Sequence, residues 1–237
     1  MAPSYPPVDR AVALVSGGLD SCVAAAVACA AAARPAFLHI SYGQRTQARE
    51  RRAFEAIADH YGVDERLAVD IEYLRQIGAS SLTDPSLDIP RGDDAPAGVP
   101  STYVPFRNAN LLAIAVAWAE ALGARAVYIG IHREGATYPD CRPAFLEAFN
   151  RLVTEGTRPD SGIQVRAPLI EMDKAGIVRL GCELEAPLHL TWSCYSREDT
   201  PCGACHSCRL RRAGFASAGV PDPVTAATST CSKGEKA

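Results

Sequence analysis

A short turn near the start of the chain constrains the fold more than any other feature of the sequence. It has the sequence Ser-Gly-Gly-Leu-Asp-Ser, residues 16–21, between an apolar run at 11–15 and an alanine-rich run from about Ser21 to Ala33. The first run is typical of a buried strand, and the second of a helix that Pro35 stops. Glycines that lead a strand straight into a helix leave free N–H groups at the helix start, where anions bind. The turn therefore predicts a phosphate site.

Strands and helices alternate along the rest of the chain, which predicts an α/β fold with a parallel sheet covered by helices on both faces. Such sheets bind ligands beyond the carboxyl ends of their strands. We expect one domain over residues 10–224 and flexible tails at 1–9 and 225–237. A segment rich in Ser, Asp, Pro and Gly, residues 80–105, is interpreted as a long functional loop whose mobility the sequence leaves open. Further strands are predicted at 36–40, 66–70, 126–131 and 164–167, and further helices at 44–61, 108–122, 142–154 and 174–180.

Composition argues against several classes of protein. The net charge is −3, which gives no support for nucleic acid as the main partner. The first ten residues lack the layout of a signal peptide. The longest apolar stretch, 22–33, has 12 residues and is too short to cross a bilayer. We expect a cytoplasmic protein with no membrane partner, and the sequence leaves a homodimer open.

The glycine turn carries polar side chains suited to a nucleotide. Ser16 and Ser21 add hydroxyl donors, whereas Asp20 would repel phosphate unless Mg²⁺ intervenes or the carboxylate caps backbone amides. The turn has neither the Walker sequence nor the Gly-x-Gly-x-x-Gly fingerprint. It resembles the pyrophosphate loop of the ATP pyrophosphatase (PP-loop) superfamily, which transfers AMP to a substrate oxygen and releases pyrophosphate. This resemblance implies that Mg-ATP binds at Ser16, Gly17, Gly18, Leu19, Asp20 and Ser21.

Four cysteines late in the chain predict a metal site within residues 190–213. Cys194, Cys202, Cys205 and Cys208 follow the spacing C-x7-C-x2-C-x2-C, which lets four thiolates surround one ion. Structural zinc fits best, and an iron–sulfur cluster uses the same ligands. The chain has nine cysteines, an odd number that argues against a disulfide framework. The others, which we interpret as structural or incidental apart from Cys141, are Cys22, Cys29, Cys182 and Cys231.

Residues around this cluster carry further expectations. Trp192 and Tyr195 could shield the metal from water. Three arginines follow the last cysteine at 209, 211 and 212. They form either a solvated helix face or a surface for an anionic ligand.

With both elements in place, the chain resembles the 7-cyano-7-deazaguanine synthase (QueC) family over about residues 11–220. The resemblance implies a small-molecule substrate, the deazapurine acid 7-carboxy-7-deazaguanine. ATP adenylates its carboxylate, ammonia converts it to an amide, and a second ATP drives dehydration to a nitrile. The motifs that carry the resemblance, besides the glycine turn, are Tyr42-Gly43-Gln44-Arg45, Val104-Pro105, Arg107-Asn108, Tyr138-Pro139-Asp140-Cys141-Arg142, Ala167-Pro168-Leu169, Asp173-Lys174-Ala175 and Trp192 through Arg211.

The family resemblance also implies roles for single residues. Asp140 would accept hydrogen bonds from a guanine-like edge, or else serve as a turn residue. Lys174 would neutralise charge on the transferring phosphoryl group. Catalysis would fall to Asp20, Lys174 and Arg107. ATP would also meet Gln44, Arg45, Arg107 and Asn108, and the substrate would meet Tyr138, Asp140, Cys141 and Arg142.

The sequence departs from the family pattern in three expected active-site segments. Thr46 stands where the family usually has His, and Phe106 where it has Gly. The loop at 132–137 is one residue shorter than the family's. An alternative function is therefore a paralogue that adenylates the same acid and then stops at the amide or joins it to another amine, such as a protein terminus. A tRNA-modifying enzyme on the same fold is the weaker alternative.

Overall fold

A five-stranded parallel sheet forms the centre of the molecule. The computed structural model describes residues 5–91, 98–133 and 137–225. The strand order is β3-β2-β1-β4-β5, and each neighbouring pair is parallel. The strands are β1 (Val8–Leu14), β2 (Ala32–Ser41), β3 (Arg66–Asp70), β4 (Ala126–Tyr128) and β5 (Gln164–Arg166).

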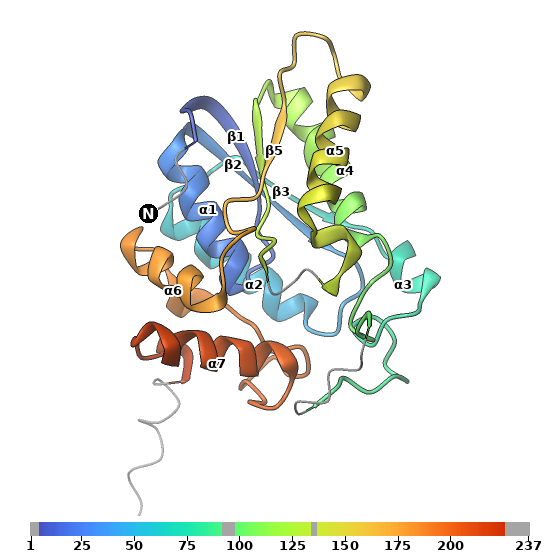
Figure 1. Ribbon diagram of the computed structural model, residues 1–237, viewed down its shortest axis with the longest axis vertical. Coiled ribbons are helices and arrows are strands. Elements are labelled where there is room, and N and C mark those ends of the chain that lie inside the picture. The colour runs from blue at the N-terminus through green and yellow to red at the C-terminus, as the bar shows by residue number, and fades with distance from the viewer. Residues whose placement is uncertain (1–4, 92–97, 134–136, 226–237) are drawn as a thin grey trace, which may run out of the picture.

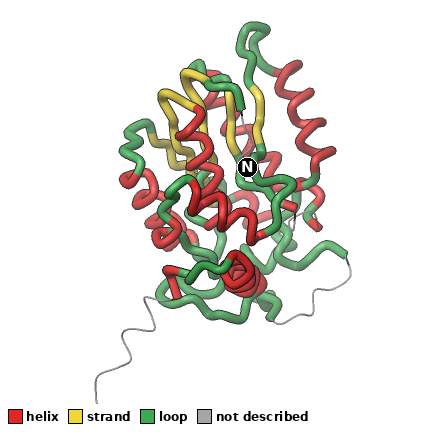
Figure 2. The backbone as a smooth tube through the Cα atoms, turned by 60° about the vertical axis from the view of Figure 1, so that its left-hand side comes forward, coloured by secondary structure: helices red, strands yellow, loops and turns green. Residues whose placement is uncertain are grey.

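Helices cover both faces of this sheet, as the alternation predicts (Figure 1). Val12 and Leu14 of β1 pack with α4 and α5, whereas Ala11 and Ala13 pack with α1, α2 and α6. Buried on both faces, the central strands are apolar rather than alternating. In the turned view the strands stay together with helices around them (Figure 2). The main helices are α1 (Leu19–Ala31), α2 (Gln47–His60), α4 (Arg107–Leu122), α5 (Pro143–Gly156) and α6 (Lys174–Glu183).

Helix α7 (His206–Ala218) lies across the lower end of the molecule, under α6 (Figure 1). The sequence analysis did not assign this helix, nor the short helices α3 (Tyr73–Ile77), η2 (Pro139–Cys141) and η3 (Leu188–Leu190). Within the described part of the chain, no helix is long and apolar enough to cross a membrane.

Two predicted boundaries at the start of the chain are wrong. β1 begins at Val8, and the ring of Tyr5 packs edge-on against Tyr128 with centroids 5.8 Å apart, so the expected tail at 1–9 is ordered from Tyr5 onward. Pro35 does not stop the first helix, which ends at Ala31; it lies inside β2. Proline is accepted there because β2 pairs with β3 only from Phe37, so one side of Pro35 has no neighbouring strand. Residues 1–4 and 226–237, including Cys231, lie outside the described residues.

The predicted loop at 80–105 has a buried base. Ser80, Ser81, Thr83 and Thr102 are at most 5% exposed, and the Ser81 N–H donates to the Ser101 carbonyl at 2.8 Å. Residues 92–97 of this loop lie outside the described residues. Hydrogen bonds to the loop's own backbone therefore anchor both of its described ends beside the sheet.

Candidate active site

A cleft of about 250 Å³ opens at the carboxyl ends of β1 and β4. The chain leaves β1 toward β2 on one side and returns to pair β4 on the other, so this is the switch point where open parallel sheets bind ligands. It is lined by the ends of β1, β2 and β4 with the residues after them, the start of α4 and residues 192–195. Single residues from other segments, Glu50, Tyr138, Cys141 and Ser207, complete the lining.

The glycine turn, the predicted phosphate loop, joins β1 to α1 and lines this cleft. Gly17 has φ +87°, and a Cβ there would lie 2.5 Å from the Glu50 carbonyl oxygen, so only glycine fits. Gly18 caps α1 without a side-chain hydrogen bond, which leaves the helix N-terminus open to an anion. The hydroxyl groups of Ser16 and Ser21 lie 3.0 Å apart. The loop is thus shaped by its own residues.

Asp20 is held by two basic side chains from distant segments. Lys174 Nζ donates to both carboxylate oxygens at 2.7 and 2.9 Å, and His132 Nε2 lies 3.5 Å from Oδ2. Burial opposes ionisation of Asp20, but the charges of Lys174 and His132 outweigh it and lower the pKa of the carboxyl. Lys174 Nζ also lies 3.2 Å from His132 Nε2. The phosphate loop therefore carries a compact set of charges.

The fold aims Lys174 at this set. Asp173 caps α6 by accepting a hydrogen bond from the Gly176 N–H at 2.7 Å, which fixes Lys174 at the first position of the helix. A Cβ at Gly214 of α7 would lie 2.4 Å from Lys174 Cγ. The glycine thus makes room for the lysine stem, and Lys174 is only 7% exposed.

Arg107 begins α4 on the other side of the cleft. Its Nη1 donates to the Tyr42 hydroxyl at 3.1 Å, and its guanidinium lies 5.4 Å from the centre of the Tyr42 ring. Burial works against its charge, but Tyr42, Cys141 and Asp140 hold the pKa of Arg107 above its usual range. The guanidinium is therefore a fixed positive charge facing the cleft.

Asp140 and Cys141 are tied to the same helix start. Asp140 Oδ2 accepts from the Asn108 N–H at 2.8 Å, and Asn108 Nδ2 donates to the Asp140 carbonyl at 3.1 Å. The Asp140 carboxylate thus satisfies the α4 N-terminus, where a negative charge is stabilised. Burial raises the pKa of Cys141 to about 11, so its thiol is neutral at pH 7.

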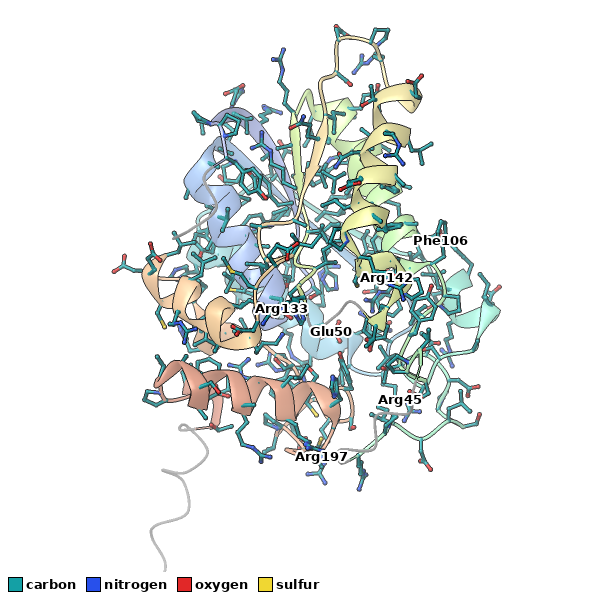
Figure 3. All side chains as sticks on the ribbon, viewed as in Figure 1. Arg45, Glu50, Phe106, Arg133, Arg142 and Arg197 are labelled. Atoms are coloured by element: carbon teal, nitrogen blue, oxygen red, sulfur yellow. The ribbon has the colours of Figure 1, made fainter. Side chains whose placement is uncertain are left out.

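Glu50 of α2 also lines the cleft, and the sequence analysis assigned it no role. Its carboxylate accepts hydrogen bonds from Gln44 Nε2 at 3.0 Å and from Thr46 Oγ1 at 2.7 Å. Burial raises the pKa of Glu50. In Figure 3 it lies near the middle of the lower end of the sheet. Its polar partners are neutral, which distinguishes it from Asp20.

Four aromatic side chains, which we call the aromatic wall, line the remaining part of the cleft. Tyr138 stacks on Tyr103 with ring centres 5.9 Å apart and shares a 2.7 Å hydrogen bond with Thr102. The rings give the cleft flat apolar surfaces of the kind that bind a planar heterocycle. The members of the wall are Tyr42, Tyr138, Trp192 and Tyr195.

The structure brings most of the predicted site residues to one cleft. Those that line it are Ser16, Gly18, Leu19, Asp20, Ser21, Arg107, Asn108, Tyr138 and Cys141. Lys174 reaches it through Asp20. Gly17 belongs to the loop but does not line the cleft.

Besides Gly17, four predicted ligand-binding residues do not line the cleft: Gln44, Arg45, Asp140 and Arg142. Arg45 donates to the Asp84 carbonyl at 2.7 Å and to the Leu87 carbonyl, and it lies toward the lower edge of the molecule, away from Glu50 (Figure 3). Gln44 is occupied by Glu50 and the Tyr42 N–H. Arg142 is an exposed N-cap of α5. These four side chains are therefore not positioned to contact a ligand in the cleft.

The four predicted metal ligands come together beside the cleft. All their Sγ atoms lie within 4.8 Å of one another, and a tetrahedral ion with bonds of about 2.3 Å sets sulfurs about 3.8 Å apart. Backbone N–H groups of Ser196 and Cys202 donate to Cys194 Sγ at 3.4 Å. Such bonds support a thiolate, and donation from the Cys205 and Cys208 thiols lowers the pKa of Cys194. The residues therefore fit a metal ion.

This cysteine element also touches the phosphate loop. The Trp192 N–H donates to the Gly17 carbonyl at 2.8 Å, and Trp192 packs with the cysteines in one buried cluster. Arg211 is neither solvated nor an anion site: it is 5% exposed and pairs with Asp222 at 2.8 Å. It also donates to Thr191 Oγ1 at 2.7 Å, which pins the segment that leads into Trp192.

Sequence reasoning missed Glu50 and His132 as cleft residues. Glu50 lies in the arginine-rich stretch 49–52, which has the composition of a solvated helix face. His132 follows a predicted strand, and its position at the carboxyl end of β4 was the one available signal. Trp192 and Tyr195 were expected to shield the metal, and they line the cleft as well.

A phosphate loop after the first strand of a parallel sheet, with a charged Asp–Lys pair at its mouth, defines the class of ATP-dependent synthases with a pyrophosphate loop. The family "Queuosine biosynthesis protein QueC" matches residues 10–219. The chain belongs to the QueC family.

Curated relatives agree with this assignment. The chain is 52% identical to the 7-cyano-7-deazaguanine synthase of Koribacter versatilis, with 91% of this chain and 92% of the relative covered. It is 50% identical to the enzyme of that name from Chlorobaculum tepidum, with 91% and 95% covered. Among solved structures, NMN synthetase from Francisella tularensis matches with a TM-score of 0.48 at 15% identity, covering 92% of this chain and 79% of that one.

Proposed function

We propose that this protein converts 7-carboxy-7-deazaguanine to 7-cyano-7-deazaguanine with ATP and ammonia. The observation that carries the proposal is the Asp20–Lys174 pair, 2.7 Å apart, at the mouth of the phosphate loop of a QueC-family chain. The names of the relatives support the substrate and product. The aromatic wall supports a planar heterocycle next to the nucleotide.

In the first step, a carboxylate oxygen of the substrate attacks the α-phosphate of ATP, and pyrophosphate leaves. The N–H groups at the start of α1 hold the leaving pyrophosphate. Asp20 would hold the Mg²⁺ that accompanies the phosphates, and Lys174 would turn from Asp20 toward the charge that builds on the phosphoryl group. Arg107 orients the substrate carboxylate. The product is an acyl adenylate, whose AMP is a good leaving group.

In the second step, ammonia attacks the acyl carbon, loses a proton and releases AMP, which gives the primary amide. The amide oxygen then attacks a second ATP and again releases pyrophosphate. Loss of AMP together with two N–H protons forms the nitrile. His132 is suitably placed to accept a proton, because it lies at the phosphate loop and 3.2 Å from Lys174.

We also propose that the four-cysteine element binds zinc as a structural ion. All four donors are cysteines, which leaves a tetrahedral ion no open position for chemistry. The ion would hold Trp192 against the phosphate loop. Elemental analysis of the purified protein, with one zinc and no iron or sulfide per chain as the expected result, distinguishes it from an iron–sulfur cluster.

The test is a product assay. Protein, Mg-ATP, ammonium and the deazapurine acid should yield AMP, pyrophosphate and a product with the mass of the nitrile. If the product stays at the amide, or if a conjugate forms only with another amine, the protein is instead the specialised paralogue described in the sequence analysis. Absence of acid-dependent AMP release would contradict both the synthase proposal and the paralogue alternative.

A further inference from the structure

Only two carboxylates line the cleft among the described residues, and they differ in the charge of the side chains that contact them. Asp20 faces Lys174 and His132. Glu50 has no Lys, Arg or His nitrogen of the described chain within 4.0 Å of its carboxylate, and its hydrogen-bond donors are a neutral amide and a hydroxyl. The charge of Arg107 lowers the pKa of Glu50 without forming an ion pair, and burial outweighs it. A partly buried carboxylate without a cation in contact is costly, so a ligand that donates hydrogen bonds to it would gain from the contact.

Arg107 is the complementary case. Within the described residues its guanidinium forms no ion pair, and its buried Nε has no hydrogen-bond partner. Its hydrogen-bond partner, the Tyr42 hydroxyl, is neutral. The cleft therefore presents one carboxylate and one guanidinium that form no ion pair with each other or with another described residue, and the aromatic wall lies alongside. A flat molecule with an N–H edge at one end and an acid at the other satisfies both.

Asp140, the carboxylate expected to read such an edge, is committed elsewhere. It is 3% exposed, does not line the cleft and accepts the Asn108 N–H at the start of α4. Each oxygen of Glu50 accepts one hydrogen bond from the protein, and a carboxylate oxygen has room for a second.

From this arrangement we infer that Glu50 is the specificity-determining residue that reads the ring N–H and exocyclic amine of the guanine-like edge. The inference rests on the proposed function and assigns the acceptor within that same site. Gln44 and Thr46 then act as positioning residues, because they hold the two oxygens of Glu50 in place. A carboxylate that receives two parallel N–H donors binds more strongly than a neutral acceptor does.

The test compares two substrates in wild type and variants. One is 7-carboxy-7-deazaguanine, and the other is the same acid without its 2-amino group. Wild type should favour the amino compound by at least about 30-fold in kcat/KM. Glu50→Gln should reduce that preference to less than about threefold while KM for ATP changes by less than about twofold. Glu55→Gln is the matched control, because Glu55 lies on the same helix and pairs with Arg51 at the surface.

Three results would overturn the inference. They are wild type without a preference, Glu50→Gln with the wild-type preference, and a Glu50→Gln variant that changes KM for ATP instead. If Glu50→Gln does not fold, Glu50→Asp provides the test, because it keeps the charge but shortens the side chain. Glu50→Asp should raise KM for the acid alone. If wild type binds the acid without releasing AMP, the proposed function fails, and the ratio of binding affinities for the two acids still tests Glu50.

Discussion

The two ends of the cleft are built in opposite ways. The phosphate loop is one continuous segment whose shape follows from its own residues, such as Gly17 with φ +87°. The aromatic wall and Glu50 come from α2, the end of β2, the loop before α5 and the cysteine element. Local backbone geometry shapes the first, although Glu50 and Trp192 also contact Gly17. Tertiary packing alone assembles the second. Under the proposed function, we expect the loop to carry the nucleotide chemistry and the assembled wall to carry the choice of substrate.

The largest expected effect distinguishes the phosphate loop from the aromatic wall. Lys174→Ala should lower the rate of acid-dependent AMP release about 10³-fold, because it removes the positive charge nearest the phosphate loop. KM for the deazapurine acid should change little, since Lys174 does not contact the aromatic wall. Steady-state kinetics with each substrate varied in turn provides the measurement.

Arg133→Ala is the matched control for Lys174. Arg133 lies 3.5 Å from Asp173 and is exposed, so its loss should change the rate less than about threefold. A Lys174→Ala enzyme that retains a tenth of the wild-type rate would show that the loop backbone alone holds the phosphates.

The same contrast decides how much the sequence could predict. The strand–turn–helix arrangement of the loop and the four-cysteine cluster are encoded within a few residues, and the structure shows both. The contact between the Asp140 carboxylate and the start of α4 could not be predicted from the motif, because only the packed structure brings the two segments together. Glu50 and His132 could not be chosen from the sequence, since a lone acid on a basic helix and a lone histidine have no local signature. Their role depends on which segments meet at the carboxyl ends of the strands.

The cysteine element touches both ends, and its loss should affect both. Cys208→Ser should release the bound metal and lower Tm by about 10 °C or more, because a structural metal contributes directly to folding. KM for ATP should rise about tenfold, since Trp192 would no longer be held against Gly17. Calorimetry and metal analysis provide the measurements.

Cys182→Ser serves as the control for the metal site, because Cys182 is exposed and lies outside the cluster. It should retain the metal and the wild-type Tm. If Cys208→Ser kept its ATP affinity after losing the metal, the element would stabilise the fold without supporting the phosphate loop.

Acid should weaken the charged end of the cleft first. The pKa of Asp20 is lowered below its usual 3.8, so its interactions stabilise the fold at neutral pH and are lost as the pH falls through the lowered value, below about pH 4. Asp20→Asn should lower the free energy of unfolding by about 2 kcal/mol at pH 7. The difference between the two proteins should narrow toward pH 3. Urea titrations at pH 7, 5 and 3 measure it, and a difference that does not depend on pH would contradict the assignment.

The smallest effect concerns Phe106, the exposed residue that precedes Arg107. Its φ is +55°, a left-handed conformation that costs a non-glycine residue about 1 kcal/mol, and its ring is 63% exposed. Phe106→Gly should therefore raise Tm by roughly 2–4 °C, as the family's usual glycine at this position suggests. Phe106→Ala keeps the strain and should not raise Tm. If both variants instead raised KM for the acid about tenfold with Tm unchanged, the strained ring would belong to the substrate site, and the wall would extend one residue beyond the cleft described above.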